Sequence, residues 1–229
     1  SLINGNEPKF GDHVLEIGSG WGSFAFYLIS KYPEITIDTL TISQEQYDFV
    51  KSKIEENHLQ GKLNVIFKDY REHQGEYSRI YSIEMFEAVG MQYWQIYFDK
   101  IKDLLKPSGI FSMQTIVIFE GLFEKYSQKI DFIQKYIFPG GMLPTVKTLE
   151  NIAIEKKLDF FVKNQMADSY HQTLEMWRQN FNHKWDKIKN LGYSNEFKRM
   201  WNFYLSYCSG GFKAKTIDVF QIDFTKNSN

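Results

Sequence analysis

The chain contains very little cysteine and proline, with one cysteine, Cys208, and five prolines among 229 residues. A single cysteine excludes an internal disulfide framework and fits the reducing conditions of the cytosol. Cys208 lies in an apolar stretch with helical spacing, so we expect it to pack in the interior. No apolar run approaches the roughly 20 residues that a membrane-spanning helix needs, and no signal peptide is visible. These absences predict a cytoplasmic protein whose contact with membranes is peripheral.

An excess of charge of either sign is also missing, because 27 basic residues face 28 acidic ones and leave a net charge of −1. Binding nucleic acid in general requires surplus Lys and Arg to neutralise phosphates, so we expect no nucleic-acid partner. Five candidates for a local basic face toward lipid headgroups remain: Lys184, Lys187, Lys189, Lys198 and Arg199. A charge-rich helix is more often simply solvated. The histidines are scattered, and their spacing predicts no metal site.

The chain has instead a large apolar fraction of 43% and an aromatic fraction of 17%. A chain of this length and composition can bury a substantial core without disulfides or metals. We find no internal repeat, low-complexity linker or composition break. A single domain over residues 1–229 is therefore expected.

Short apolar runs alternate with stretches of helical spacing in the first half of the chain. The expected strands cover residues 13–18, 36–42, 64–69, 79–85 and 110–118. Helical spacing covers residues 21–32 and 92–105, and Ser43 in SQEQ can cap a further helix. Strands and helices that alternate in this way predict a parallel sheet covered on both faces.

The second half is dominated by helical patterns. We expect helices over 121–136, 170–190 and 196–206, and strands over 159–165 and 216–224. Pro139-Gly140-Gly141 and Pro144 end the first of these helices. The resulting prediction is one α/β sheet with a helical cover inserted after the fifth strand.

A glycine-rich turn follows the first expected strand in the sequence LEIGSGWG. Gly18 and Gly20 allow a ligand to approach the backbone closely, and ligands of α/β sheets bind beyond the carboxyl ends of the strands. The spacing differs from the dinucleotide fingerprint G-x-G-x-x-G. The acidic Glu16 before the first glycine suits a cationic ligand such as S-adenosylmethionine better than a phosphate. Trp21 and Tyr70 can add cation–π attraction, although aromatic residues more often serve packing.

Eight segments spread over nearly the whole chain carry a family resemblance. They are LEIGSGWG, LTISQEQ, KDYRE, SIEMFEAVG, KYIFPGGMLPT, SYHQTLEMWRQNF, RMWNFYLSYCSGGF and IDVFQIDFTK. In this order they resemble the cyclopropane-fatty-acyl-phospholipid synthases and mycolic acid cyclopropane synthases. The resemblance implies the class I methyltransferase (Rossmann-like) fold, with a seven-stranded sheet. It also implies an S-adenosylmethionine-dependent enzyme that converts the cis double bond of an unsaturated phospholipid acyl chain into a cyclopropane at the membrane surface.

The resemblance also assigns residues to the cofactor and to the reaction. Besides Glu16, the resemblance places three groups of residues around S-adenosylmethionine. They are Gly18 and Gly20 at the methionine moiety, Thr41, Ile42 and Gln46 at the ribose and adenine edge, and Asp69, Tyr70 and Arg71 at the adenine. In the family a bicarbonate ion lies beside the transferred methyl group and is the expected base. Its holders correspond to Glu87, the backbone of Ile116, Tyr170 and the side chain of Gln114.

Three departures from the family pattern leave alternatives open. Gln114 stands where many of these enzymes have a histidine, and glutamine cannot carry a proton or a positive charge. Fungal sphingolipid C-methyltransferases also tend to have glutamine there, which favours methylation without ring closure. Ala88 replaces a histidine of plant alkaloid N-methyltransferases, so an amine substrate is less expected. The family's N-terminal cofactor-covering segment is expected to be missing here. A methyltransferase for another lipid or a soluble small molecule, and an S-adenosylmethionine-binding protein without turnover, are the alternatives.

Overall fold

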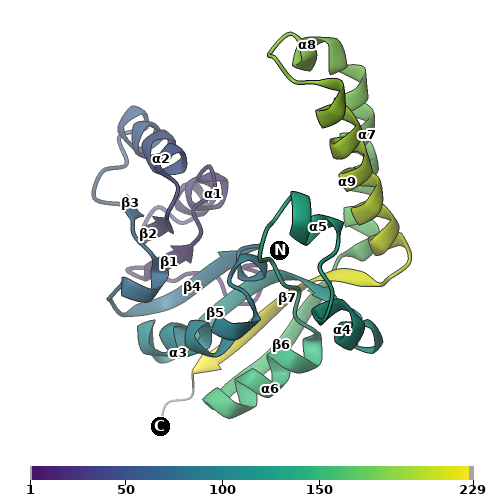
Figure 1. The fold of residues 1–229 in the computed structure, drawn as a ribbon. Coiled ribbons are helices and arrows are strands. Elements are labelled where there is room, and N and C mark those ends of the chain that lie inside the picture. Colours follow the sequence, from purple (N-terminus) through teal and green to yellow (C-terminus); the bar gives the residue numbers. More distant parts are fainter. Residues whose placement is uncertain (1, 227–229) are drawn as a thin grey trace.

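The computed structural model describes residues 2–226 and is built on a seven-stranded sheet of order β3-β2-β1-β4-β5-β7-β6 (Figure 1). The strands are β1 His13–Ile17, β2 Thr36–Thr41, β3 Leu63–Phe67, β4 Tyr77–Ile83, β5 Leu105–Ile118, β6 Leu158–Gln165 and β7 Ile217–Lys226. Strands β1 to β5 pair parallel with one another, whereas β7 runs antiparallel to both β5 and β6. The seven-stranded class I methyltransferase fold is thereby confirmed.

The strand order reverses at β1, which pairs with β2 on one side and with β4 on the other. Connections leave the carboxyl ends of β1 and β4 in opposite directions, and this opens a crevice at the sheet edge. The glycine-rich turn after β1 and the SIEMFEAVG segment after β4 both lie there. The topology therefore brings the two regions that the sequence singles out to one end of the sheet.

Four helices pack on the two faces of the sheet and support this end. They are α1 Ser23–Lys31, α2 Gln44–Glu56, α3 Trp94–Leu104 and α6 Val146–Lys156. Ser43 caps α2 as expected, because its side chain accepts a hydrogen bond from the Gln46 N–H at 3.3 Å. Helix α6 was missed from the sequence, where no element was expected between Pro144 and residue 159. It begins at a Thr145 cap that accepts from the Thr148 N–H at 3.0 Å.

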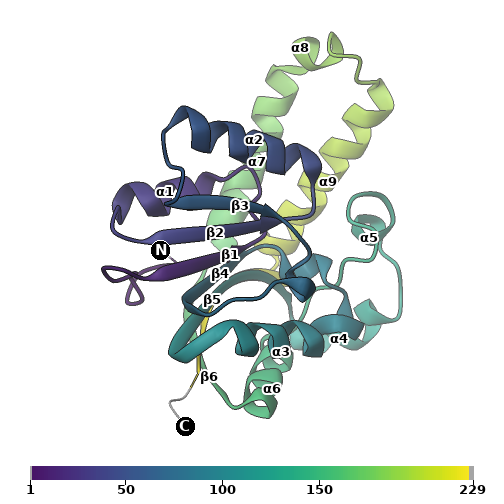
Figure 2. The same cartoon turned by 90° about the vertical axis from the view of Figure 1, so that its left-hand side faces the viewer.

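The helical cover comes in two parts, of which the first follows the fifth strand as predicted and the second follows β6. Short helices α4 Glu120–Ser127 and α5 Phe132–Tyr136 follow β5, whereas α7 Ala167–His183, α8 Trp185–Lys189 and α9 Asn195–Lys213 lie between β6 and β7. Helices α7 and α9 form a long hairpin that projects from the sheet, with α8 at its tip (Figures 1 and 2). Amides of Asn182 and Asn202 join its two arms at 2.6 Å.

Several expected boundaries were wrong for local reasons. The helix expected over 121–136 is divided in two, because Asp131 and Gln134 form a capping box at which a separate helix, α5, begins. The helix expected over 170–190 breaks at Lys184, and the one expected to end at residue 206 continues to Lys213. Strand β5 begins five residues early, at Leu105, with an irregular register opposite Tyr77 and Arg79.

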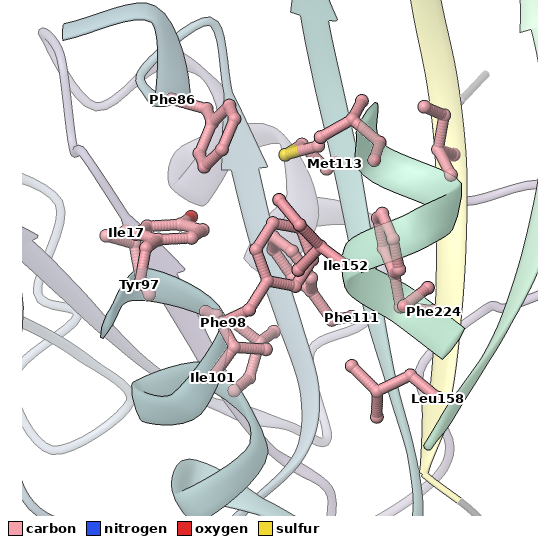
Figure 3. Close-up of a cluster of buried hydrophobic side chains, with 14 of the residues drawn as sticks. Ile17, Phe86, Tyr97, Phe98, Ile101, Phe111, Met113, Ile152, Leu158 and Phe224 are labelled. Carbon is pink, nitrogen blue, oxygen red and sulfur yellow. The ribbon is translucent and has the colours of Figure 1, made fainter. Parts of the chain in front are cut away.

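The larger hydrophobic core lies between the sheet and helices α3 and α6, and it contains a cluster of aromatic rings (Figure 3). Phe98 is fully buried and packs edge-on against Phe224 at a centroid distance of 5.0 Å, with Phe86 and Phe111 also in contact. Edge-to-face pairs of this kind add to the free energy of burying the rings. Because Phe86 directly precedes Glu87, this core fixes the position of the segment after β4.

We predict that Phe98→Ala lowers the free energy of unfolding by about 3–5 kcal/mol, because it removes a ring that contacts four others. Chemical denaturation followed by circular dichroism measures this loss. Phe161→Ala is the control, since that ring is 66% exposed on β6 and its loss should change stability by about 0.5 kcal/mol or less. A loss below about 1 kcal/mol for Phe98→Ala would contradict this account of the core.

Candidate active site

The turn after β1 is built around glycines in the left-handed region. Gly18 has φ +93°, Gly20 +49° and Gly22 +83°. The N–H groups of Gly18 and Ser19 both donate to the Leu40 carbonyl, at 3.1 and 2.7 Å, and tie the turn to β2. A Cβ at Gly20 would meet nothing within 4 Å. The turn therefore leaves open room beside its backbone at Gly20, as a closely approaching ligand requires.

Glu16, the last but one residue of β1, is a buried carboxylate below this turn. It accepts a hydrogen bond of 2.5 Å from the Thr39 hydroxyl, and burial raises its pKa to about 8. Within residues 2–226 it forms no ion pair with a basic side chain. A buried carboxylate without a cation beside an open glycine turn fits the sulfonium and ammonium groups of S-adenosylmethionine.

The end of β2 carries the three residues expected at the ribose and adenine edge. Thr41 donates to the Gln46 side-chain oxygen at 2.8 Å and accepts from the Ser43 N–H at 3.1 Å. This orientation leaves the amide nitrogen of Gln46 as a donor. The Ile42 side chain is 72% exposed and offers an apolar surface next to that pair.

The end of β3 carries the residues expected at the adenine, in a short 3₁₀ helix, η1 Tyr70–Glu72. Asp69 caps this helix, and both of its oxygens accept from the Arg71 guanidinium, at 3.0 and 2.7 Å. The hydrogen bonds from Arg71 hold the pKa of Asp69 below its usual value. Tyr70 is half-buried against the Tyr97 ring at 5.1 Å. The predicted cofactor residues thus gather at the ends of β1, β2 and β3, and their contacts with S-adenosylmethionine stay a prediction.

A second polar cluster occupies the ends of β4 and β5, where Glu87 lies in the 3₁₀ helix η2 Phe86–Ala88. One Glu87 oxygen, Oε1, accepts from the Ile116 N–H at 2.5 Å and from the Thr115 hydroxyl at 2.9 Å. The other, Oε2, is buried and has no hydrogen-bond partner among the described residues. Burial is the main cause that raises the pKa of Glu87 to about 7, and the neighbouring charge of Glu84 adds to it.

Gln114 and Tyr170 meet at a carboxylate that the sequence analysis did not single out, that of Glu84. The Gln114 amide nitrogen donates to Glu84 Oε1 at 2.9 Å and to the Tyr170 hydroxyl at 2.8 Å, and that hydroxyl donates to Glu84. Gln221 donates to the Gln114 side-chain oxygen at 2.8 Å and so fixes the direction of the amide. The structure therefore brings all four predicted reaction residues together and adds Glu84 between them.

A cavity of about 300 Å³ adjoins this cluster. Glu84, Ile116 and Tyr170 line it at the sheet, and the remaining lining residues come from α7 and α9: Thr173, Leu174, Trp177, Tyr204, Cys208 and Phe212. Burial raises the pKa of the Cys208 thiol to about 12, so the thiol is neutral at physiological pH and acts as an apolar group. The cavity is thus an apolar chamber with a polar end, the shape that a hydrocarbon chain with one reacting position needs.

The model of the mycolic acid cyclopropane synthetase family matches residues 5–222. The chain belongs to this family. The family predicted from the eight ordered segments is therefore confirmed.

Two individual relatives and one solved structure agree with this membership. The chain is 35% identical over 221 residues to the cyclopropane-fatty-acyl-phospholipid synthase of Escherichia coli, covering 95% of this chain and 54% of that protein. It is 33% identical over 214 residues to the tuberculostearic acid methyltransferase of Mycobacterium tuberculosis, covering 92% and 49%. The chain thus spans about half the length of either relative. The solved structure of a cyclopropane synthase from Mycobacterium tuberculosis superimposes with a TM-score of 0.89 at 23% identity, covering 98% of this chain and 81% of that one.

A bicarbonate ion, which the family resemblance implies, does not fit the side chains as they stand. Its expected donors are the Gln114 amide, the Tyr170 hydroxyl and the Ile116 N–H. The first two donate to Glu84 and the third to Glu87, so each already serves a carboxylate of the chain itself. An added anion would also meet the negative charge of Glu84, which disfavours it.

The raised pKa of Glu16 predicts a proton release when S-adenosylmethionine binds. At pH 7 a group with a pKa of about 8 is mostly protonated, and an adjacent cation favours its ionised form. The affinity for S-adenosylmethionine should therefore rise as the pH increases toward 8. Calorimetry at pH 7 in buffers of different ionisation enthalpy counts the released proton.

Glu16→Gln is the control for this measurement, because glutamine still accepts a hydrogen bond from Thr39 but cannot ionise. The variant should bind with less proton release than the wild type. An equal release from both proteins would show that Glu16 does not face the cofactor's charge.

Proposed function

We propose that this protein transfers a methyl-derived carbon from S-adenosylmethionine to the cis double bond of an unsaturated phospholipid acyl chain and closes it to a cyclopropane. The observation that carries the proposal is the apolar cavity between α7, α9 and the sheet, which ends at Glu84 and Tyr170, to both of which the Gln114 amide donates. Membership in the cyclopropane synthetase family supports it.

Residues at the ends of β1, β2 and β3 would hold the methyl donor. Glu16 would balance its positive charge, the turn at Gly18 and Gly20 would admit its methionine moiety, and Thr41 with Gln46 would meet its ribose. When bound, S-adenosylmethionine supplies an electrophilic methyl group. The reversal of strand order between β1 and β4 sets this site beside the cavity.

The cavity has to position a weak nucleophile and shield the charge that develops on it. An alkene reacts only when it is held in line with the methyl group at close range, and the rigid walls from Ile116, Leu174 and Phe212 restrict the acyl chain in this way. A positive charge grows on the chain as the new bond forms. The faces of Trp177 and Tyr204, and the carboxylates of the two glutamates, stabilise such a charge.

A peripheral position at the membrane surface is part of the proposal. Among residues 2–226, the structure contains no helix of the length and hydropathy that crossing a bilayer demands. Of the basic candidates, Lys184, Lys187 and Lys189 lie at the hairpin tip, next to Leu191, which is 78% exposed. Cations beside an exposed apolar side chain suit the interface of an anionic bilayer.

Methyl transfer without ring closure is the second candidate, and Gln114 favours it because this side chain cannot accept a proton. The similarity to a tuberculostearic acid methyltransferase supports the same reading. The two candidates differ in product, since a cyclopropane resists mild hydrogenation and an alkene does not.

The proposal predicts a lipid product one methylene heavier when the full-length protein acts on vesicles of monounsaturated phospholipid with S-adenosylmethionine. Mass spectrometry before and after mild hydrogenation identifies the ring. Glu87→Gln should lower the rate by about 100-fold or more, because it removes the negative charge beside the reacting centre. Binding of S-adenosylmethionine, measured by calorimetry, should be retained in that variant.

Glu55→Gln provides the matched control, since this glutamate is exposed on α2. Its rate should equal that of the wild type. A hydrogenation-sensitive product would favour the second candidate. Bound cofactor with no lipid product would contradict both candidates, and turnover of Glu87→Gln at the wild-type rate would refute the role of that carboxylate.

A further inference from the structure

Glu84 adopts a backbone conformation that costs free energy. It directly follows β4 with φ +50°, in the left-handed region that residues other than glycine seldom occupy. Its N–H donates to the Gln114 carbonyl at 2.8 Å, which holds the backbone in this state. Strain of this kind persists only where the surrounding structure enforces it, and it is often found at functional sites.

The conformation directs the Glu84 carboxylate to the polar end of the cavity. Oε1 of Glu84 accepts from the Gln114 amide and from the Tyr170 hydroxyl, and Glu84 itself lines the cavity. Gln114 is held in turn by Gln221 at 2.8 Å. Donors from β5 and α7 therefore fix one oxygen, and the carboxylate lies where a reacting chain would end.

Glu84 and Glu87 have different surroundings, which separates their roles. Glu87 is partly buried: its Oε2 is enclosed, and its Oε1 accepts from the Ile116 N–H and the Thr115 hydroxyl. Glu84 is exposed, and it lines the cavity. A proton accepted by Glu84 can leave to water, whereas one on Glu87 would stay in the interior. Two carboxylates in unlike environments commonly divide such roles in an active site.

We propose that Glu84 is the group that accepts the proton during ring closure, so that the chain's own carboxylate stands in place of an added anion such as bicarbonate. The inference rests on the proposed function for its substrate. It follows from the occupied donors, because Gln114 and Tyr170 already hold a carboxylate at this position.

The step balances without a further reactant. The π electrons of the alkene form a bond to the methyl carbon as the carbon–sulfur bond breaks, and S-adenosylhomocysteine leaves with that electron pair. The acyl chain now carries a positive charge. Glu84 accepts one proton from the new methyl group, and the released C–H electron pair forms the third side of the ring. The carboxylic acid then loses its proton to solvent.

The test compares wild type, Glu84→Gln and Glu84→Gly on monounsaturated phospholipid vesicles, with and without added bicarbonate. Wild-type turnover should be the same in bicarbonate-depleted and bicarbonate-supplemented buffer. Glu84→Gln should lose about 100-fold or more in kcat, the usual contribution of a positioned base. Glu84→Gly should be equally slow without bicarbonate and recover to within about tenfold of wild type with it, because the glycine leaves the donors free.

A readout independent of turnover uses ¹³C-labelled bicarbonate and nuclear magnetic resonance. Wild type should leave the bicarbonate line unchanged, whereas Glu84→Gly should broaden it. Glycine also removes the left-handed strain, so Glu84→Gly should unfold no more easily than wild type. Lys157→Gly is the control for the removal of strain, because Lys157 is exposed and has φ +57° after α6. This substitution should change the stability of the protein and leave turnover and the bicarbonate line unchanged.

The outcomes separate this inference from the proposed function. A bicarbonate requirement in wild type, or a Glu84→Gln rate within about tenfold of wild type, would overturn the role of Glu84. If neither the wild type nor the variants make a lipid product, the proposed function fails. The bicarbonate resonance then tests the inference about Glu84 by itself. Broadening by Glu84→Gly only would support the inference, and equal broadening by wild type would overturn it.

Discussion

The site depends on one junction, the pairing of the carboxyl ends of β4 and β5. The Glu84 N–H donates to the Gln114 carbonyl, and two residues later the Ile116 N–H donates to the Glu87 carboxylate. Phe86, between the two glutamates, is fully buried among the rings of the core. The aromatic core, the sheet register and the position of two carboxylates are therefore parts of one arrangement, so that a change in packing around Phe86 would move the reacting groups.

This junction also relates the two halves of the site. Strand β4 pairs with β1 on its other side, and β1 carries Glu16 and the glycine turn. The Glu16 carboxylate and the open glycine turn therefore lie on the strand next to β4, and the end of β4 carries the cluster that faces the apolar cavity. This arrangement suits a reaction between a positively charged donor and an uncharged hydrocarbon, because the donor would lie beside a carboxylate and the hydrocarbon in an apolar cavity.

Much of the fold could be predicted from the sequence, because β1, β2 and β4 are short, largely buried runs and because stretches with helical spacing separate the strands. The boundaries that failed depend on details outside periodicity: the Asp131–Gln134 capping box, the break at Lys184 and the irregular start of β5. Glu87, Gln114, Ile116 and Tyr170 were found through the family resemblance. Glu84 was not, although it lies in the same segment as Glu87. Its importance comes from a left-handed backbone and from a contact with Tyr170, 86 residues away, and neither is visible in a linear sequence.

The most direct test of ring closure uses S-adenosylmethionine whose transferred methyl group carries three deuterium atoms. The full-length protein would act on monounsaturated phospholipid vesicles in bicarbonate-depleted buffer, and mass spectrometry would count the deuterium in the product. If Glu84 accepts one deuteron from the transferred methyl group, the product is a saturated ring that retains two deuterium atoms. A branched product that retains all three would show that the proton leaves from the acyl chain, and it would contradict the account.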